Sequence, residues 1–237
     1  MLGISIVIPA YNEEKYLGPC LDAVQRNVLP HVLEVLVIDN ASTDRTGEIA
    51  RSYPGVRVVR EDRKGLAYAR QRGFEESRGA IIAFIDADTR PLPGWIARIG
   101  NAFTRDANMA CISGPYRMYD IPVFNQRISR CWDYFALPLY YLFGYIVIGG
   151  NFAIRRKVLA AMGGFDPTIQ FYGDDVNVGR QAKKHGRVRF DMQLVMPSSA
   201  RRMKAEGYVR TIYRYVANYL SIAMAGKVLT GEHTDVR

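Results

Sequence analysis

Four short apolar runs rich in valine and isoleucine recur in the first 85 residues, and helix-like stretches separate them. The runs cover residues 4–8, 34–38, 56–59 and 80–85. The stretches between them carry apolar residues at helical spacing and open near Asn12, Thr43 and Gly65. Apolar runs of this kind are typical of strands in a parallel sheet, because helices cover both faces of such a sheet. The alternation therefore predicts an α/β fold with a doubly wound sheet.

The bulk composition fits one globular domain in a reducing compartment. The chain has 237 residues, of which 49% are hydrophobic and 23% charged, and this profile is typical of a protein with one sizeable core. The cysteines Cys20, Cys111 and Cys131 lie far apart, so neither a disulfide frame nor a zinc site is expected. Met1 leads straight into the first apolar run, without the leader of a signal peptide. We therefore expect a cytoplasmic protein.

The fourth apolar run ends on two carboxylates, Asp86 and Asp88, which Ala87 separates. In an α/β sheet, ligands bind beyond the carboxyl ends of the strands, so both side chains are expected to reach a crevice there. Oxygen ligands at this spacing suit hard divalent ions such as Mg²⁺ or Mn²⁺. Such ions hold the oxygens of a diphosphate, and the pair therefore indicates nucleotide-sugar chemistry.

Two other strands of the expected sheet end in side chains that could hold a nucleoside. The first ends near Pro9, Tyr11 and Glu13, where the ring can stack on a base and the carboxylate can accept from a ribose or base. The second ends at Asp39, which can accept from a base N–H. The same letters also fit an ordinary helix start or turn, with Asp44 as a cap. The conjunction of three such strand ends is more specific than any one of them.

Two charged pairs lie further along the chain. Asp174 and Asp175 precede a helical pattern, so they fit either a helix start stabilised by the helix dipole or a carboxylate that takes a proton from an acceptor hydroxyl. Arg201 and Arg202 follow a strand-like segment. Their guanidinium groups suit diphosphate oxygens through paired donors, and a solvated surface pair is the other interpretation.

Positive charge is concentrated at the end of the chain. The net charge is +9, and residues 178–237, with 12 Lys and Arg against 4 Asp and Glu, contribute +8 of it. Anionic lipid and phosphorylated substrates are compatible with such a tail; nucleic acid is not expected, since no recognition motif accompanies the charge. Residues 134–148 are aromatic and almost uncharged, but shorter than the roughly 20 residues that span a bilayer. They fit a buried core segment or a surface that touches lipid.

Residues 206–224 predict an amphipathic, basic helix. Arg210, Arg214 and Asn218 lie on one side of it. The expected apolar face on the other side consists of Val209, Ile212, Tyr213, Val216, Tyr219, Leu220 and Ala223. Docking of this helix on the protein's own core and contact with a membrane interface are both open.

Together, these motifs resemble those of glycosyltransferase family 2, whose members have the nucleotide-diphospho-sugar transferase (GT-A) fold. The motifs occur in the same order as in the family, across residues 4–202. Its elements are Ile-Pro-Ala-Tyr-Asn-Glu at 8–13, Asp-Asn-Ala-Ser-Thr-Asp at 39–44, Lys-Gly-Leu-Ala-Tyr-Ala-Arg at 64–70, Asp-Ala-Asp at 86–88, Gly-Gly-Asn at 149–151, and Gly-Gly-Phe-Asp at 163–166 ahead of Gly-Asp-Asp.

The resemblance implies one GT-A domain of Rossmann-like α/β architecture, with a mixed, mostly parallel central sheet flanked by helices. This domain would cover residues 1–204, with a nucleotide-binding half at 1–110 and an acceptor-binding half at 111–204. The basic amphipathic helix and tail would follow at 205–237.

Roles for individual residues also follow from the resemblance. Asp175 would be the catalytic base, and Asp174 would be a shortened form of the Glu that the family usually has before it. Asp88 would bind Mn²⁺ or Mg²⁺ directly, and Asp86 the ribose or the metal. The acceptor would contact Gly150 and Asn151, and the nucleotide Pro9, Tyr11, Glu13, Asp39, Arg70, Asp86, Ala87, Arg201 and Arg202.

The implied activity is an inverting, metal-dependent transfer of a sugar from a UDP- or GDP-sugar to a hydroxyl or phosphate of an acceptor. The Gln-x-x-Arg-Trp signature of processive synthases is absent after residue 175, which favours addition of a single sugar. The aromatic stretch and the basic tail suggest a lipid-linked acceptor and a peripheral position on an anionic membrane, at its cytoplasmic inner face. The alternatives are a sugar nucleotidyltransferase, whose Gly-rich, Lys-containing loop is missing here, and a non-catalytic sugar-nucleotide-binding module, which the intact carboxylates disfavour.

Overall fold

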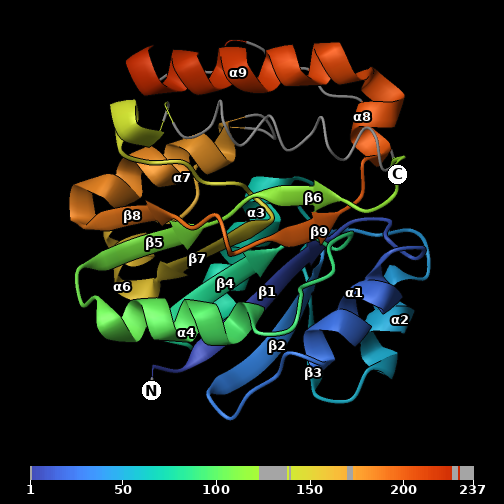
Figure 1. Cartoon of the computed structure of the whole chain (residues 1–237). Helices are drawn as coiled ribbons and strands as arrows, with labels where there is room; N and C mark the ends of the chain where they lie inside the picture. Colours follow the sequence, from blue (N-terminus) through green and yellow to red (C-terminus); the bar gives the residue numbers. More distant parts are fainter. Residues whose placement is uncertain (1, 123–137, 139, 170–172, 226–228, 230–237) are drawn as a thin grey trace.

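The computed structural model describes residues 2–122, 138, 140–169, 173–225 and 229. Its centre is a seven-stranded sheet in the order β3-β2-β1-β4-β7-β5-β8, with β6 and β9 paired as a separate two-stranded sheet (Figure 1). The strands are β1 (Ile4–Ala10), β2 (Val32–Asp39), β3 (Val56–Arg60), β4 (Ile81–Ile85), β5 (Met109–Ser113), β6 (Tyr116–Met118), β7 (Asn151–Arg155), β8 (Arg187–Phe190) and β9 (Met196–Ser198). The helices are α1 (Leu17–Gln25), α2 (Thr46–Ser52), α3 (Leu66–Glu76), α4 (Trp95–Arg105), α6 (Arg156–Ala161), α7 (Asp174–Ala182), the short 3-10 helix η1 (Lys183–His185), α8 (Arg201–Glu206) and α9 (Tyr208–Ala225).

The sheet is mixed, and one strand accounts for the mixture. Strands β3, β2, β1 and β4 run parallel to one another, and so do β5 and β8. Strand β7 lies between these two groups and runs antiparallel to both neighbours, β4 and β5. The expected mostly parallel α/β sheet flanked by helices is therefore confirmed.

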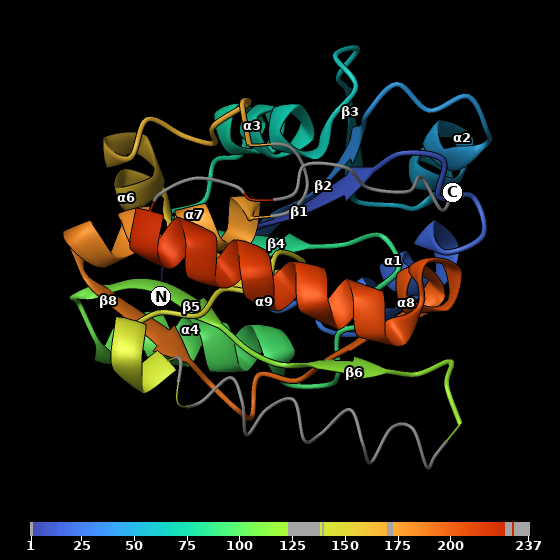
Figure 2. The same cartoon turned by 90° about the horizontal axis from the view of Figure 1, so that it is seen from above.

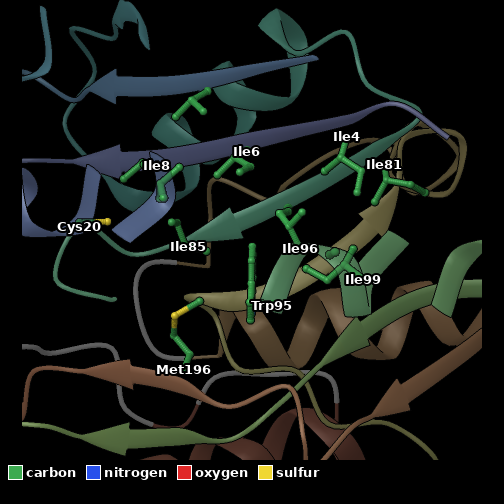
Figure 3. Close-up of a cluster of buried hydrophobic side chains, with 14 of the residues drawn as sticks. Ile4, Ile6, Ile8, Cys20, Ile81, Ile85, Trp95, Ile96, Ile99 and Met196 are labelled. Atoms are coloured by element: carbon green, nitrogen blue, oxygen red, sulfur yellow. The ribbon is translucent and has the colours of Figure 1, made fainter. Parts of the chain in front are cut away.

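The core lies on both faces of the sheet. Ile4, Ile6 and Ile8 point to one face, where they pack with apolar side chains of α1 and α4 (Figure 3). Val7 points to the other face, towards α3, α6 and α7. A Cβ at Gly73 of α3 would overlap the Val7 side chain, so glycine lets this helix lie close against β1. Burial on both faces explains why the strands read as continuous apolar runs.

The first helix begins later than the sequence suggested. We expected Asn12 to open it as a cap, but α1 starts at Leu17, and Asn12 has φ 51°. The Asn12 side chain instead accepts the backbone N–H of Thr43 at 2.8 Å. Asp44 accepts the backbone N–H groups of Glu14 at 3.1 Å and Thr46 at 2.9 Å. These polar side chains tie the loops after β1 and β2 together, which brings two strand ends of the expected site side by side.

The last helix buries only part of its apolar face. Within α9, the buried residues are Thr211, Asn218, Tyr219 and Ile222, and Leu220 and Ala223 pack against the core, whereas Val209 and Tyr213 of the same apolar face are exposed. Five residues of the aromatic stretch 134–148, namely 134–137 and 139, lie outside the described residues. The burial of the other ten is mixed, since Tyr145 is buried and Tyr141 exposed. Among the helices that the structure describes, none has the length and apolar character needed to cross a membrane.

Candidate active site

The carboxyl ends of β1, β2 and β4 meet the beginning of β7 at one edge of the sheet (Figure 1). The pairing places Ile85 of β4 opposite Asn151 of β7. Because β7 is antiparallel, its first residues arrive where the parallel strands end. Asp86 after β4 therefore faces the segment 149–151, where a Cβ at Gly150 would overlap its carboxyl group.

Asp86 is held in place by three neighbours. Tyr116 donates its hydroxyl to Asp86 Oδ2 at 2.9 Å, and Arg70 Nη2 lies 3.6 Å from Asp86 Oδ1. Burial and the carboxylates of Asp86 and Asp88 raise the pKa of the Tyr116 hydroxyl well above its usual value, so it stays a donor. The Asp86 main-chain oxygen accepts both the N–H and the hydroxyl of Thr89, at 3.1 and 2.7 Å. The turn after β4 is thus fixed, with the Asp86 side chain still 38% exposed to a ligand.

Arg201, at the start of α8, links the two predicted donor-binding loops. Its Nη1 and Nη2 donate to both oxygens of Glu13 at 2.8 and 2.5 Å, and its Nε lies 2.9 Å from Asp88 Oδ2. Glu13 is buried, and its main-chain N–H donates to Thr46 Oγ1 at 2.7 Å. Residues 188 positions apart therefore form one charged cluster at the end of β1 and β4.

Arg70 joins the acidic pair of α7 to this cluster. It is buried and forms a charged hydrogen bond with the buried carboxylate of Asp174, and its Nη2 donates to the Gly149 oxygen at 2.6 Å. Asp174 is therefore committed to neutralising an arginine in the interior. This contact explains why a carboxylate stands at this position, since an unpaired buried guanidinium would be costly.

Asp175 is the member of the pair that remains available for proton transfer. Its Oδ2 accepts the Gly149 N–H at 3.3 Å, and its Oδ1 accepts the N–H of Val176 at 2.9 Å. Burial is the main cause, and the charge of Asp174 the second, of a rise in the pKa of Asp175 from 3.8 to about 6. A carboxylate with a pKa near the working pH is suited to act as a general base.

The predicted nucleoside side has its own polar pairs. Lys64 Nζ lies 4.1 Å from the centre of the Tyr11 ring and 2.7 Å from its hydroxyl. Asp39 Oδ1 accepts the Ser42 N–H at 3.1 Å, and Arg60 Nη1 donates to Asp39 Oδ2 at 3.1 Å. Tyr11 follows β1 and Asp39 is the last residue of β2, next to the two loops that are tied together, so both lie at strand ends.

Of the two residues predicted to contact the acceptor, Gly150 lies against Asp86 and Asn151 lies in the interior. A Cβ at Gly150 would overlap both the Asp86 carboxyl and the Tyr116 hydroxyl, so the main chain passes directly against the carboxylate. Asn151 is fully buried; it accepts from Trp95 Nε1 at 2.9 Å and donates to the Gly114 and Leu194 oxygens. The side chain of Asn151 thus fixes the start of β7, which does not fit a direct acceptor contact.

The remaining predicted residues are less directly placed at the cluster. Pro9 pairs within the sheet with Ile38, and Ala87 is buried between the two carboxylates in sequence. Arg202 lies 3.5 Å from Glu206 along α8, so the structure turns this guanidinium towards its own helix.

Sequence reasoning missed Tyr116 and Arg60 as site residues. Arg60 ends β3 and pairs in register with Asp39, so the rule that ligand-binding groups gather at strand ends would have found it. Tyr116 lies in β6, outside the main sheet, and nothing in its sequence surroundings singled it out.

A divalent cation fits this site if the substrate supplies part of its coordination. In the part of the chain that the structure describes, no three His, Cys, Asp or Glu side chains converge as a metal site. Mg²⁺, however, is typically bound by one or two carboxylates together with phosphate oxygens and waters. Asp88 already holds a cationic group, Arg201, against its carboxylate. The oxygen donors Asp86 and Asp88 therefore suit Mg²⁺ or Mn²⁺ carried with a diphosphate.

Comparison with known proteins extends the sequence resemblance. Glycosyltransferase AglE of Haloferax volcanii is 43% identical over 101 residues, which are 40% of this chain and 33% of the relative. A dolichol-phosphate mannosyltransferase of Pyrococcus furiosus is 33% identical over 136 residues, or 54% of this chain and 38% of the relative. The matched regions thus span little more than a third of these relatives.

A solved structure shows the same fold. The mannosyltransferase PcManGT from Pyrobaculum calidifontis, in complex with GDP-Man and Mn²⁺, superposes with a TM-score of 0.70, covering 98% of this chain and 66% of that one at 21% identity. A family model described as Glycosyl transferase family 2 matches residues 5–163, from β1 to just past α6. Because this match covers more than half of the sequence, the chain belongs to glycosyl transferase family 2.

Proposed function

We propose that this chain transfers a sugar from a nucleotide-diphospho-sugar to an acceptor hydroxyl or phosphate, with inversion at the anomeric carbon. The observation that carries the proposal is Asp175, whose pKa lies near 6 and whose carboxylate accepts the N–H of Gly149, the residue whose carbonyl oxygen accepts from Arg70. Arg70 in turn lies beside Asp86. A base of suitable pKa and a carboxylate proposed to bind the ribose or the metal are thus linked through one arginine.

In the proposed mechanism, Asp175 removes the proton from the acceptor hydroxyl as its oxygen attacks the anomeric carbon. The bond from that carbon to the diphosphate breaks on the opposite face, so one displacement inverts the centre. A divalent cation held by Asp88 and Asp86 would supply Lewis-acid stabilisation of the diphosphate charge. Arg201 would add donors to the same oxygens once it leaves Glu13.

The donor side would bind the nucleoside between Tyr11 and Asp39. Asp39 keeps a carboxylate beside Arg60, so the pair offers an acceptor and a donor to a base edge. Both uracil and guanine present an N–H next to a carbonyl, and a UDP- or GDP-sugar is therefore the proposed donor. This fits the division into a nucleotide-binding half, residues 1–110, and an acceptor-binding half, residues 111–204.

The acceptor is proposed to be lipid-linked, with the protein peripheral at the cytoplasmic face of the membrane and adding single sugars. The support is the +8 charge of residues 178–237 and the similarity to a dolichol-phosphate mannosyltransferase.

The test is a thermal-shift screen of UDP, GDP, CDP and ADP, each with and without Mn²⁺. A ligand that binds only the folded state raises the melting temperature. We expect a shift with UDP or GDP that grows when Mn²⁺ is present, and its loss in Asp88→Asn. The matched control is Asp106→Asn, which alters a carboxylate paired with Arg187 away from the site. No shift with any nucleotide, or one that ignores Mn²⁺, would contradict the proposed donor site.

A further inference from the structure

The last helix exposes several large apolar side chains to solvent, although Tyr219 and Ile222 are buried in the core. In α9, Val209 is 83%, Tyr213 65% and Met224 71% exposed, whereas the polar residues Thr211 and Asn218 are buried. A helix of a soluble protein normally turns its apolar stripe to the core. This exposure of apolar side chains sets α9 apart from α4, whose apolar residues Ile96, Ile99 and Phe103 are all buried.

Specific polar contacts hold α9 in this orientation. Arg214 Nη1 donates to Glu206 Oε2 at 3.1 Å, and the Tyr219 hydroxyl donates to the Tyr145 oxygen at 2.8 Å. Asn218 Oδ1 accepts the N–H of Leu229 at 2.9 Å. Rotation of the helix to bury its apolar stripe would break these contacts and leave buried polar groups unpaired. The outward apolar face is therefore a fixed feature of the fold.

The exposed apolar side chains gather around α9. Of the twelve exposed large hydrophobic residues among those that the structure describes, nine lie between Tyr141 and Leu229. Phe143 contacts Tyr219 edge-on, with ring centres 5.7 Å apart, which brings the exposed Tyr141 and Leu142 next to the helix. Figures 1 and 2 show α9 lying along the outside of the molecule, over α7. An apolar patch of this kind marks an interaction surface.

The charged and aromatic residues of α9 indicate which kind of partner this apolar surface fits. Helix α9 contains Arg210 and Arg214 and no acidic residue, and three of its exposed side chains are tyrosines, Tyr208, Tyr213 and Tyr215. Arg210 is exposed and follows Val209 directly in the chain. Tyrosine and arginine beside an apolar stripe suit the boundary between lipid headgroups and acyl chains.

We propose that the outward face of α9 is a docking surface for an anionic lipid bilayer, with the helix lying in the membrane plane. The inference deepens the proposed function and rests on it for the acceptor alone. Helix α8 leads directly from Arg201 in the charged cluster to the start of α9. A bilayer on α9 would therefore hold a lipid-linked acceptor close to the site that uses it.

The experiment is flotation of the full chain with vesicles of phosphatidylcholine containing one third phosphatidylglycerol, in low and high salt, against vesicles of phosphatidylcholine alone. The wild type should float with the anionic vesicles, and less so in high salt. The double variant Val209→Ser with Tyr213→Ser should partition about tenfold less or lower, since two apolar side chains no longer enter the interface. Leu33→Ser is the matched control, because Leu33 is 54% exposed on β2 and should leave flotation unchanged.

Three results would overturn the inference. They are absence of wild-type flotation with anionic vesicles, equal flotation of the double variant, and a dimer in solution that the double variant converts to monomers. Both substituted residues are exposed, so the nucleotide-dependent thermal shift of the double variant should match the wild type and report an intact fold. A protein that shifts with nucleotide but never floats refutes the docking surface alone, whereas flotation without any nucleotide shift refutes the donor site alone.

Discussion

The substitution Asp175→Asn tests two properties of this carboxylate: its role as a base in the transfer reaction, and the free energy that its ionisation costs the folded protein. Asparagine is nearly the same size, and its side-chain oxygen can still accept the N–H of Gly149 or Val176 that Asp175 now accepts. It cannot take a proton from the acceptor. We expect donor binding to be retained and transfer to fall by about 10²- to 10⁴-fold, the usual contribution of a general base.

The same substitution should stabilise the protein at neutral pH. Burial and the Asp174 charge raise the pKa of Asp175 from 3.8 to about 6 in the folded state. At about 1.4 kcal/mol for each pH unit, this corresponds to up to about 3 kcal/mol of cost to folding once Asp175 is ionised. Because the folded-state pKa is the higher one, the cost is full above pH 6 and disappears below about pH 4. The free energy of unfolding of Asp175→Asn should therefore exceed that of the wild type at pH 7 and approach it near pH 4.

Urea unfolding of both proteins across this pH range measures the difference, and the pH dependence of kcat for the wild type should show transfer falling below about pH 6. Asp174→Asn is the matched control, because it removes the partner of buried Arg70 and should destabilise the fold by about 3–5 kcal/mol. A stability difference for Asp175→Asn that does not change with pH would refute the pKa argument. If Asp175→Asn transferred sugar normally while Asp174→Asn was folded but inactive, the catalytic base would be Asp174 instead.

Other variants test the charged cluster. Asp88→Asn should weaken both transfer and Mn²⁺-dependent nucleotide binding in calorimetry, by at least the roughly tenfold that even indirect metal partners contribute. Arg201→Met frees Asp88 from its guanidinium; Mn²⁺ alone should then bind more tightly in electron paramagnetic resonance titrations, while nucleotide diphosphates bind about tenfold more weakly because charged donors are lost. Unchanged Mn²⁺ affinity would show that the arginine does not compete for this carboxylate. Gly150→Ala places a methyl group against Asp86 and Tyr116 and should cost about 1–3 kcal/mol in urea unfolding, with reduced transfer; a variant as stable and active as the wild type would contradict the close approach.

The strands were predictable from sequence because their burial is uniform. Runs such as 80–85 lie between two layers of helices, so nearly every residue is apolar and the pattern is unambiguous. The late start of α1 was not predictable, because the interactions of Asn12 and Asp44 join loops 30 or so positions apart. The direction of β7 was not predictable either. Its five residues are all buried, and such a short buried strand fits a parallel and an antiparallel neighbour equally well.

The candidate site also has a part that was predictable from the sequence and a part that was not. Asp39, Asp86 and Asp88 follow from the rule that ligand-binding groups gather at strand ends. The side chains that contact them, such as Arg201 beside Asp88, come from distant segments whose meeting depends on the tertiary fold. The orientation of α9 stayed open for a related reason, because amphipathicity indicates that a helix has two faces, whereas buried partners such as Glu206 decide which one points inward.

The reversed direction of β7 gives the two halves of the molecule different freedom to change. The chain that joins β6 to β7 re-enters the sheet beside Asp86, so residues added or removed before Gly149 would alter what meets the sugar without moving β1, β2 or β4. Those three strands, which would hold the nucleotide under the proposed function, run parallel to one another and are joined by crossovers that do not involve β7. Under that proposal, a single antiparallel strand would let new acceptors be acquired during evolution while the donor half stays unchanged.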